Sequence, residues 1–146
     1  MATAFDLAAF AAELDVLRAE PEASRWHIER DNSVPLGVLV GMYPASAPEE
    51  QFLARFRWDQ LTDPASLKFL NLKSRSDTDR TAWPKCPGFR PGNLDACVSW
   101  TKEGHALHPD WRTTDKASFE SPPNPVAFVV AHLQHLLDAH YGGRGP

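Results

Sequence analysis

The sequence predicts an α+β fold made of an N-terminal helix, a four-stranded antiparallel meander sheet, long loops and a C-terminal helix. Apolar residues recur at helical spacing near both ends of the chain, at 7–17 and 126–137. Four short strand-like runs joined by short loops lie between them, an order that favours an antiparallel meander with a helix on one face. The 146 residues are enough for one domain, 1–146, with its own hydrophobic core.

The N-terminal helix is predicted from four apolar residues spaced three or four positions apart: Leu7, Phe10, Leu14 and Leu17. Thr3 and Asp6 have the spacing of a capping box, which would satisfy free amide groups in the first turn. Pro21 is expected to stop this helix, because proline lacks the amide hydrogen that a helix interior needs.

Four strands are predicted from short runs that are rich in apolar residues: 26–29, 36–43, 51–58 and 67–72. A turn at 31–33 joins the first two runs. In the third run, Phe52 and Phe56 alternate with Arg55 and Arg57. Apolar and charged residues therefore occupy opposite faces of a half-buried strand.

Two long irregular stretches, 73–92 and 102–123, flank a brief apolar run at 94–101 that contains Cys97. Irregular stretches of this length are uncommon inside a compact domain and are often functional. A final helix is predicted at 125–141, opened by a proline and carrying a clean apolar stripe. The glycine pair after it is expected to end the helix, and a conjugated di-glycine tail is the alternative interpretation.

The composition argues against several classes of function. The formal charge is −4 and the basic residues are scattered, so no nucleic-acid partner is expected. No apolar run approaches the roughly 20 residues that cross a bilayer, and no signal peptide precedes the first helix, so we expect a cytoplasmic protein away from membranes. The sequence contains no phosphate-loop, nucleophile-elbow or His-Glu-x-x-His motif. Their absence weakens the interpretation of the chain as a small-molecule enzyme. In a reducing compartment, Cys86 and Cys97 should be free thiols.

Several local features resemble the ubiquitin-conjugating enzyme (UBC-like) family. They are the third predicted strand, the Asp63-Pro64 turn and the start of the fourth strand, then Trp83-Pro84, Gly92, Cys97, Trp111, Ser121-Pro122-Pro123 and the helix from Pro125. In that family, similar positions hold the third and fourth strands, a proline-rich loop, a glycine, the catalytic cysteine, and a tryptophan and proline segment before the next helix. The chain is similar to compact, divergent bacterial members found in ubiquitin-like conjugation operons associated with phage defence.

The chain departs from the family pattern in two ways. The family's His-Pro-Asn tripeptide places an asparagine eight residues before the cysteine, and Phe89 stands at that position here. The asparagine that stabilises the oxyanion in the family is therefore missing from this position. The chain also has one helix after the cysteine, where typical eukaryotic members continue with more.

The resemblance implies that Cys97 carries a ubiquitin-like modifier as a thioester and passes it to an amine. Asn93 is a candidate to stabilise the oxyanion, and a plain turn residue is its alternative role. Asp95, His105 and His108 are candidates to orient or deprotonate the attacking amine, although loop histidines are often simply solvated. The implied partners are the modifier, an activating enzyme and a target protein. No cofactor is implied, and a monomer is expected.

Other interpretations of these residues stay open. Cys97 can be a small buried hydrophobe, since free cysteine is among the most buried residue types. Cys86 lies between prolines, is expected to be exposed, and is the second candidate nucleophile. A non-catalytic binding module with the same strand order would hold a ubiquitin-like protein without a working cysteine.

Two metal sites are further alternatives. Cys86, Cys97, His105 and His108 form the ligand set of many zinc sites, although their spacing lacks a Cys-x-x-Cys pair. The last helix offers three residues at spacings of three that could form a surface metal clip or a polar flank of the helix: His132, His135 and Asp138.

Overall fold

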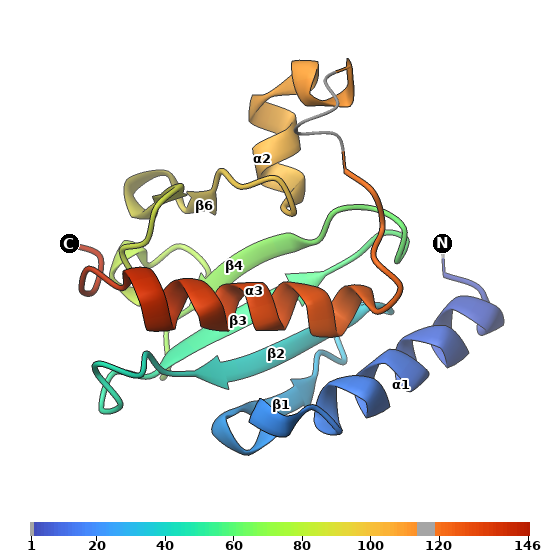
Figure 1. Cartoon of the computed structure of the whole chain (residues 1–146), viewed down its shortest axis with the longest axis horizontal. Coiled ribbons are helices and arrows are strands. Elements are labelled where there is room, and N and C mark those ends of the chain that lie inside the picture. Colours follow the sequence, from blue (N-terminus) through green and yellow to red (C-terminus); the bar gives the residue numbers. More distant parts are fainter. Residues whose placement is uncertain (1, 114–118) are drawn as a thin grey trace.

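The computed structural model describes residues 2–113 and 119–146 and has the predicted α+β layout (Figure 1). The helices are α1 (Ala4–Arg18), α2 (Lys102–Leu107) and α3 (Pro125–His140). The strands are β1 (His27–Arg30), β2 (Gly37–Met42), β3 (Phe52–Arg57), β4 (Ser66–Leu70), β5 (Phe89–Arg90) and β6 (Asp95–Ala96). Short 3₁₀ turns are η1 (Pro21–Arg25), η2 (Arg80–Ala82), η3 (Pro91–Asn93) and η4 (Pro109–Thr113).

The first helix begins with the predicted capping box. The Asp6 amide donates to Thr3 Oγ1 at 3.1 Å, and the Thr3 amide donates to Asp6 Oδ2 at 2.8 Å. Phe10 and Leu14 are buried as expected, but Leu7 is 40% exposed. The N-terminal end of α1 extends past the sheet, which accounts for the exposure of Leu7 (Figure 1).

Strands β1 to β4 form the predicted antiparallel meander, with each strand paired to the next along the chain. Alternation gives the sheet two faces. One face carries Phe52 and Phe56 into the main core, which lies between the sheet and the helices. The other face carries Arg55 and Arg57, each of which forms an ion pair with an aspartate. The prediction for β3 is therefore confirmed.

Helix α3 crosses the core face of the sheet and contacts α1 (Figure 1). Its predicted apolar stripe is buried, including Val126, Leu133 and Leu137. After the helix, the Gly142 amide donates to the Lys85 carbonyl at 2.8 Å, and the Lys85 amide donates to the Gly143 carbonyl at 2.7 Å. The glycine pair therefore follows the helix end, as predicted, and also pairs with the first long loop.

The second stretch predicted as irregular, 102–123, contains α2 and η4, so that prediction was wrong for 102–113. A six-residue helix with a glycine inside it has too few hydrogen bonds to form alone, and it carries no helical periodicity that a sequence pattern would detect. Tertiary contacts stabilise it, and they are part of the candidate site.

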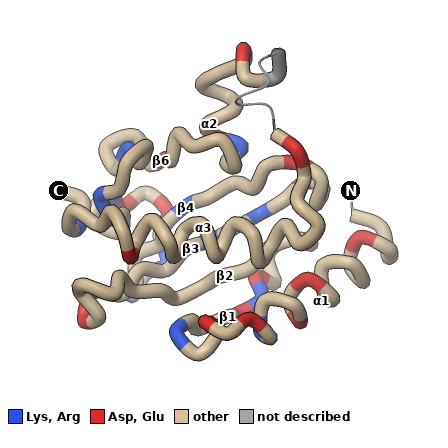
Figure 2. The backbone as a smooth tube through the Cα atoms, viewed as in Figure 1, with Lys and Arg blue, Asp and Glu red and all other residues tan. Residues whose placement is uncertain are grey.

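Charged residues of both signs are spread along the chain, and Lys and Arg occur on several separate elements (Figure 2). Within the described ranges, none of the helices has the length and apolar character needed to span a membrane.

Candidate functional site

Cys97 follows the two-stranded ribbon of β5 and β6. Phe89 pairs with Ala96, and both side chains are buried against the core. The Cys97 amide donates to the Gly88 carbonyl at 2.7 Å, which extends the ribbon by one pair. Because side chains alternate along a ribbon, Cys97 lies on the face opposite the buried pair. Cys97 as a residue is half-buried, whereas Cys86 is buried.

Gly88 allows the ribbon to bring Cys97 this close to the loop before it. Its φ is +85°, a left-handed conformation that residues with a side chain rarely adopt. A Cβ at this position would lie 2.9 Å from Val98 Cγ1 and 3.0 Å from the Cys97 carbonyl oxygen. Glycine is therefore required here both by conformation and by space.

Helix α2 is fixed to the cysteine loop by the buried side chain of Thr101. Its Oγ1 accepts a hydrogen bond from the Gly104 amide at 3.0 Å and donates to the Ala96 carbonyl at 2.6 Å. Glu103 fixes the helix to the sheet, because its carboxylate accepts from the Leu67 amide at 3.0 Å. These bonds set the position of the residue that caps the helix, His108.

His108 lies directly beside the candidate nucleophile. Its Nε2 is 3.1 Å from Cys97 Sγ, and its ring stacks on Trp111 with centroids 4.4 Å apart and planes 9° apart. An imidazole at this distance can accept the thiol proton, and the resulting imidazolium stabilises the thiolate. Of the predicted site residues, His108 is the one that the fold brings to the sulfur.

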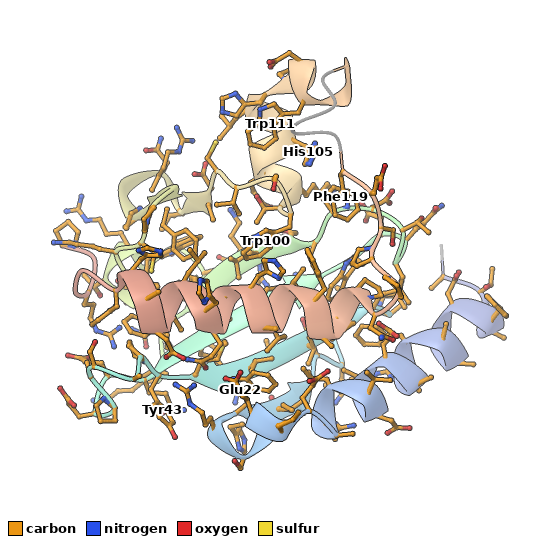
Figure 3. The ribbon with its side chains drawn as sticks, in the orientation of Figure 1. Glu22, Tyr43, Trp100, His105, Trp111 and Phe119 are labelled. Carbon is orange, nitrogen blue, oxygen red and sulfur yellow. The ribbon has the colours of Figure 1, made fainter. Side chains whose placement is uncertain are left out.

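His105 does not contact the sulfur directly. Its Nε2 is 2.7 Å from the Ser99 carbonyl oxygen, and the edge of its ring packs on Trp111 and on Phe119. Figure 3 shows these three aromatic side chains gathered around α2. His105 thus contacts Trp111, the residue on which His108 stacks, and we expect a structural role for it.

Asp95 forms a bidentate pair with Arg90, and its predicted role toward an attacking amine stays a prediction. Its two carboxylate oxygens accept hydrogen bonds from Arg90 Nε and Nη2, both at 2.7 Å. These hydrogen bonds raise the pKa of the Arg90 guanidinium, and the negative charge of a Cys97 thiolate adds to that rise. Sequence reasoning missed Arg90, because a pairing of two-residue strands leaves no periodic pattern to read.

Asn93 is exposed at the end of the η3 turn. Among the contacts between described residues, none joins its side chain to Cys97. Leu94, which follows it, adopts a left-handed conformation with φ 58°, and its carbonyl accepts a hydrogen bond from Lys68 Nζ at 2.7 Å. The position of Asn93 fits a turn residue, and its role at the oxyanion stays a prediction.

Cys86 was expected to be exposed, and that expectation was wrong. Its side chain is 9% exposed, and its Sγ lies 3.8 Å from the Leu136 carbonyl oxygen on α3. Burial raises the pKa of the Cys86 thiol to about 11, because a thiolate is poorly solvated there. The proline-containing loop folds onto the last helix, and the prolines therefore do not hold Cys86 in solvent.

Neither possible metal site is assembled. Within residues 2–113 and 119–146, no group of three or more His, Cys, Asp or Glu side chains is placed to hold a metal ion. Asp138 instead binds Arg25 through two hydrogen bonds, and His132 bonds to the Phe128 carbonyl in the preceding turn.

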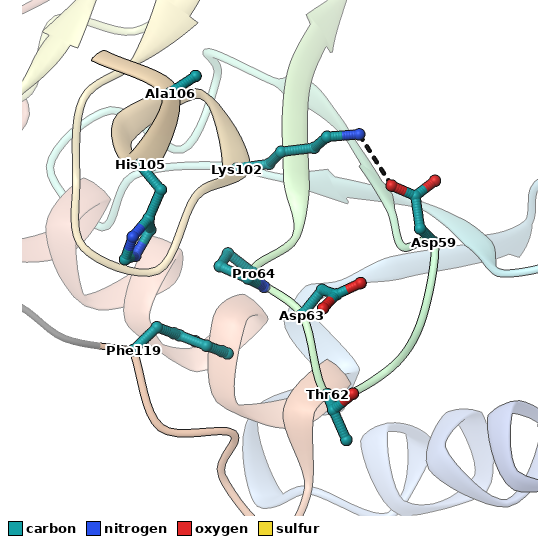
Figure 4. Close-up of a pocket in the computed structure, with 8 residues that line it drawn as sticks. All are labelled: Asp59, Thr62, Asp63, Pro64, Lys102, His105, Ala106 and Phe119. Carbon is teal, nitrogen blue, oxygen red and sulfur yellow. Dashed lines mark hydrogen bonds and ion pairs between the residues drawn. The ribbon is translucent and has the colours of Figure 1, made fainter. Parts of the chain in front are cut away.

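A cavity of about 660 Å³ lies beside α2, between His105, Phe119 and the turn at 59–64 (Figure 4). An ion pair between Lys102 and Asp59, with an Nζ–Oδ2 distance of 2.9 Å, borders it. The described residues that line this cavity do not include Cys97 or His108. The cavity therefore shares α2 with the candidate site, through His105 and Lys102, but is distinct from the surroundings of the sulfur.

Comparison with family models, with curated protein sequences and with solved structures finds no match to this chain. A function therefore has to be inferred from the residues around Cys97 and from their geometry. Two of these residues, Arg90 and Trp111, had not been assigned a chemical role from the sequence.

Proposed function

We propose that this chain is a ubiquitin-like-protein conjugating enzyme that carries its modifier as a thioester on Cys97. The observation that supports it most is the 3.1 Å contact between His108 Nε2 and the half-buried Cys97 Sγ. An imidazole at this distance is a common activator of nucleophilic thiols, whereas a cysteine that only fills space in a core needs no base. The order of the elements supports the conjugating class through its resemblance to that family's fold.

In the loading step, the Cys97 thiol gives its proton to His108 Nε2, and the thiolate attacks the carbonyl carbon of a modifier held as a thioester on an activating enzyme. The new carbon–sulfur bond forms as a tetrahedral intermediate. The old carbon–sulfur bond then breaks, and the departing thiolate takes the proton from the imidazolium. One thioester replaces another, so atoms and charges balance without a cofactor.

In the transfer step, a neutral amine of the target attacks the thioester carbon on Cys97. An amide bond forms as the carbon–sulfur bond breaks, and His108 takes the proton that the amine loses. The sulfur leaves as a thiolate and is reprotonated by the imidazolium, which restores the starting state. His108 is the described residue placed to move both protons, because its Nε2 already lies at hydrogen-bonding distance from the sulfur.

The wider setting follows from the same resemblance. The proposed partners are a ubiquitin-like modifier, an activating enzyme and a target protein, and the protein acts as a monomer in the cytoplasm. By that resemblance, the pathway is a bacterial ubiquitin-like conjugation system in antiviral defence.

A cysteine hydrolase is the second candidate, since the same contact between His108 and Cys97 would activate a thiol whose acyl group water then removes. A non-catalytic module that holds a ubiquitin-like protein is the third, and it would make no covalent bond. The three candidates differ in the fate of an acyl group offered to Cys97, which makes them separable in one experiment.

The experiment uses a short fluorescent peptide thioester ending in Gly-Gly, followed by free lysine or by buffer alone. A conjugating enzyme forms an adduct that thiols remove, and lysine then discharges it as the peptide amide faster than water does. Cys86→Ser retains the adduct, whereas Cys97→Ala loses it. Release mainly as the free acid in the presence of lysine would favour the hydrolase. If no adduct forms with the peptide or with modifier-loaded activating enzymes, the binding module is favoured.

A further inference from the structure

Arg90, Asp95 and Cys97 lie on the same face of the β5–β6 ribbon. Arg90 is paired directly with Asp95, and residues opposite each other in an antiparallel pair share a face. Cys97 is two positions beyond Asp95 in a ladder that its own amide continues, so it shares that face too. Burial agrees with this arrangement, because the intervening Phe89 and Ala96 point into the core.

Asp95 fixes the orientation of the Arg90 guanidinium. It occupies Nε and Nη2 through two bonds of 2.7 Å, the bidentate geometry that gives arginine–carboxylate pairs their specificity. Among the described residues, Arg90 Nη1 has no hydrogen-bond acceptor. The Asp95 side chain is 14% exposed and the Arg90 side chain is 40% exposed, so a partly buried acid supports a cation that remains accessible.

Arg90 and Cys97 share one face of the ribbon, so a guanidinium and a thiolate there attract each other. The hydrogen bonds that Arg90 donates to Asp95 are the main cause of the raised pKa of Arg90, and a negative charge on Cys97 contributes in the same direction. His108 approaches the same sulfur from α2. A Cys97 thiolate therefore has an arginine on its own face of the ribbon and an imidazole at hydrogen-bonding distance from the end of α2.

We propose that Arg90, positioned by Asp95, is an anion-binding residue of the Cys97 site and donates from Nη1 to the negatively charged oxygen of the acyl group. Its physiological ligand is the oxyanion that develops on the carbonyl oxygen during thioester exchange, and this part of the inference depends on the proposed function. A preorganised cation beside such an oxygen lowers the barrier because the charge appears only in the transition state. Arg90 would then supply the role that the sequence assigned to Asn93.

The test compares alkylation of Cys97 by iodoacetate, which carries a carboxylate, with alkylation by iodoacetamide, its neutral counterpart. Both reactions form a carbon–sulfur bond and release iodide, and neither needs a modifier or an activating enzyme. We expect Arg90→Gln to lower the ratio of the iodoacetate rate to the iodoacetamide rate about threefold to tenfold, the effect of removing one nearby charge in a partly solvated site. Arg90→Lys retains the positive charge but lacks the paired N–H donors of the guanidinium, so it should keep part of the preference for iodoacetate.

Arg75→Gln is the matched control, because Arg75 forms an exposed ion pair with Glu29 elsewhere on the surface. This control should leave the ratio unchanged. Asp95→Asn should not lower the ratio as Arg90→Gln does, because it keeps the cation and removes a neighbouring negative charge. An unchanged ratio in a folded Arg90→Gln variant would overturn the proposal.

If Arg90→Gln does not fold, the same question can be tested in His108→Gln, which removes the imidazolium and keeps Arg90. The quantity measured is then the salt dependence of the ratio of the iodoacetate rate to the iodoacetamide rate. A cation beside the sulfur offsets the repulsion between the thiolate and iodoacetate, so the ratio should rise less steeply with ionic strength than it does for a free cysteine peptide. A rise as steep as that of the free peptide would contradict the anion site.

A second measurement addresses the oxyanion itself. In transfer from a peptide thioester, Arg90→Gln should lower kcat with little change in KM, because the oxyanion is absent from the ground state. A charge effect on alkylation without thioester transfer would leave the anion site standing and reject the conjugating function. Thioester transfer in the wild type, together with an alkylation ratio that Arg90→Gln leaves unchanged, would support the conjugating function and reject the anion site.

Discussion

The two cysteines show how strongly position controls the chemistry of one residue type. Cys97 is half-buried beside an imidazole, whereas Cys86 is buried in apolar surroundings with a pKa of about 11. The reactive form of a thiol is the thiolate, so this difference separates their rates at neutral pH.

We predict that iodoacetamide at pH 7.5 modifies Cys97 and leaves Cys86 unmodified in the folded protein. With a pKa of about 11, fewer than about one in a thousand Cys86 thiols is ionised at that pH. Peptide mass spectrometry over time measures both sites. Cys86→Ser should not change the rate at Cys97, and modification of Cys86 at an equal rate would contradict its burial.

We predict that His108→Gln slows alkylation of Cys97 by about tenfold or more, because the thiol loses its proton acceptor and the thiolate loses a counter-charge. Trp111→Leu should slow it less, since the imidazole remains but loses its stacking partner. Trp111→Phe should restore most of the rate. If Cys97 is alkylated equally fast in Trp111→Leu and Trp111→Phe, stacking does not position His108.

At the scale of elements, α2 connects the cysteine loop to the sheet. Gly104 packs so closely on the cysteine loop that a Cβ there would overlap the Val98 carbonyl oxygen and lie 2.9 Å from Thr101 Oγ1. This close packing, together with the hydrogen bonds of Thr101 and Glu103, fixes the position of α2 against the cysteine loop and β4. His108 is at the sulfur because α2 occupies that position.

We predict that Gly104→Ala destabilises the protein by about 1–3 kcal/mol, a typical cost of overpacking, and slows alkylation of Cys97 as His108 moves away. Gly92→Ala is the matched control, because a Cβ at Gly92 meets nothing within 4 Å. Denaturant unfolding and alkylation rates measure the two effects. Equal behaviour of the two variants would show that α2 tolerates displacement.

At the scale of the whole molecule, Asp138 holds the last helix to the start of the sheet. Its carboxylate accepts two hydrogen bonds from Arg25, at 2.8 and 2.9 Å, and further bonds from Gln134 and the Ala45 amide. The Arg25 guanidinium is the main cause that lowers the pKa of Asp138 below its usual range. This cluster joins η1, the loop after β2, and α3.

We predict that Asp138→Asn lowers the free energy of unfolding at pH 7 by about 1–3 kcal/mol, the usual worth of hydrogen bonds to a charged group. A depressed folded-state pKa stabilises the protein above the unfolded value of about 3.9, and the contribution disappears as the pH falls through the folded-state pKa. Denaturant titrations at several pH values should therefore show the difference between the wild type and Asp138→Asn shrinking as the pH falls below about 3.9. A constant difference would contradict the ionic origin of the effect.

The amino-acid sequence by itself determined the helices at both ends, the four strands and their meander order. Those features depend on local spacing, so they are visible in the positions of Phe10 and Leu14 or of Phe52 and Phe56. The sequence also indicated Cys97 as the candidate nucleophile, through its resemblance to a family and not through any pattern of its own.

Only the tertiary structure decided which groups surround that sulfur. His108 reaches Cys97 because a short helix, too weak to form alone, is held by Thr101 and by the sheet. The pairing of Arg90 with Asp95 and the burial of Cys86 likewise depend on segments meeting in space. Such contacts are not periodic along the chain. Their energy comes from packing and hydrogen bonds between distant residues, which a linear pattern does not record.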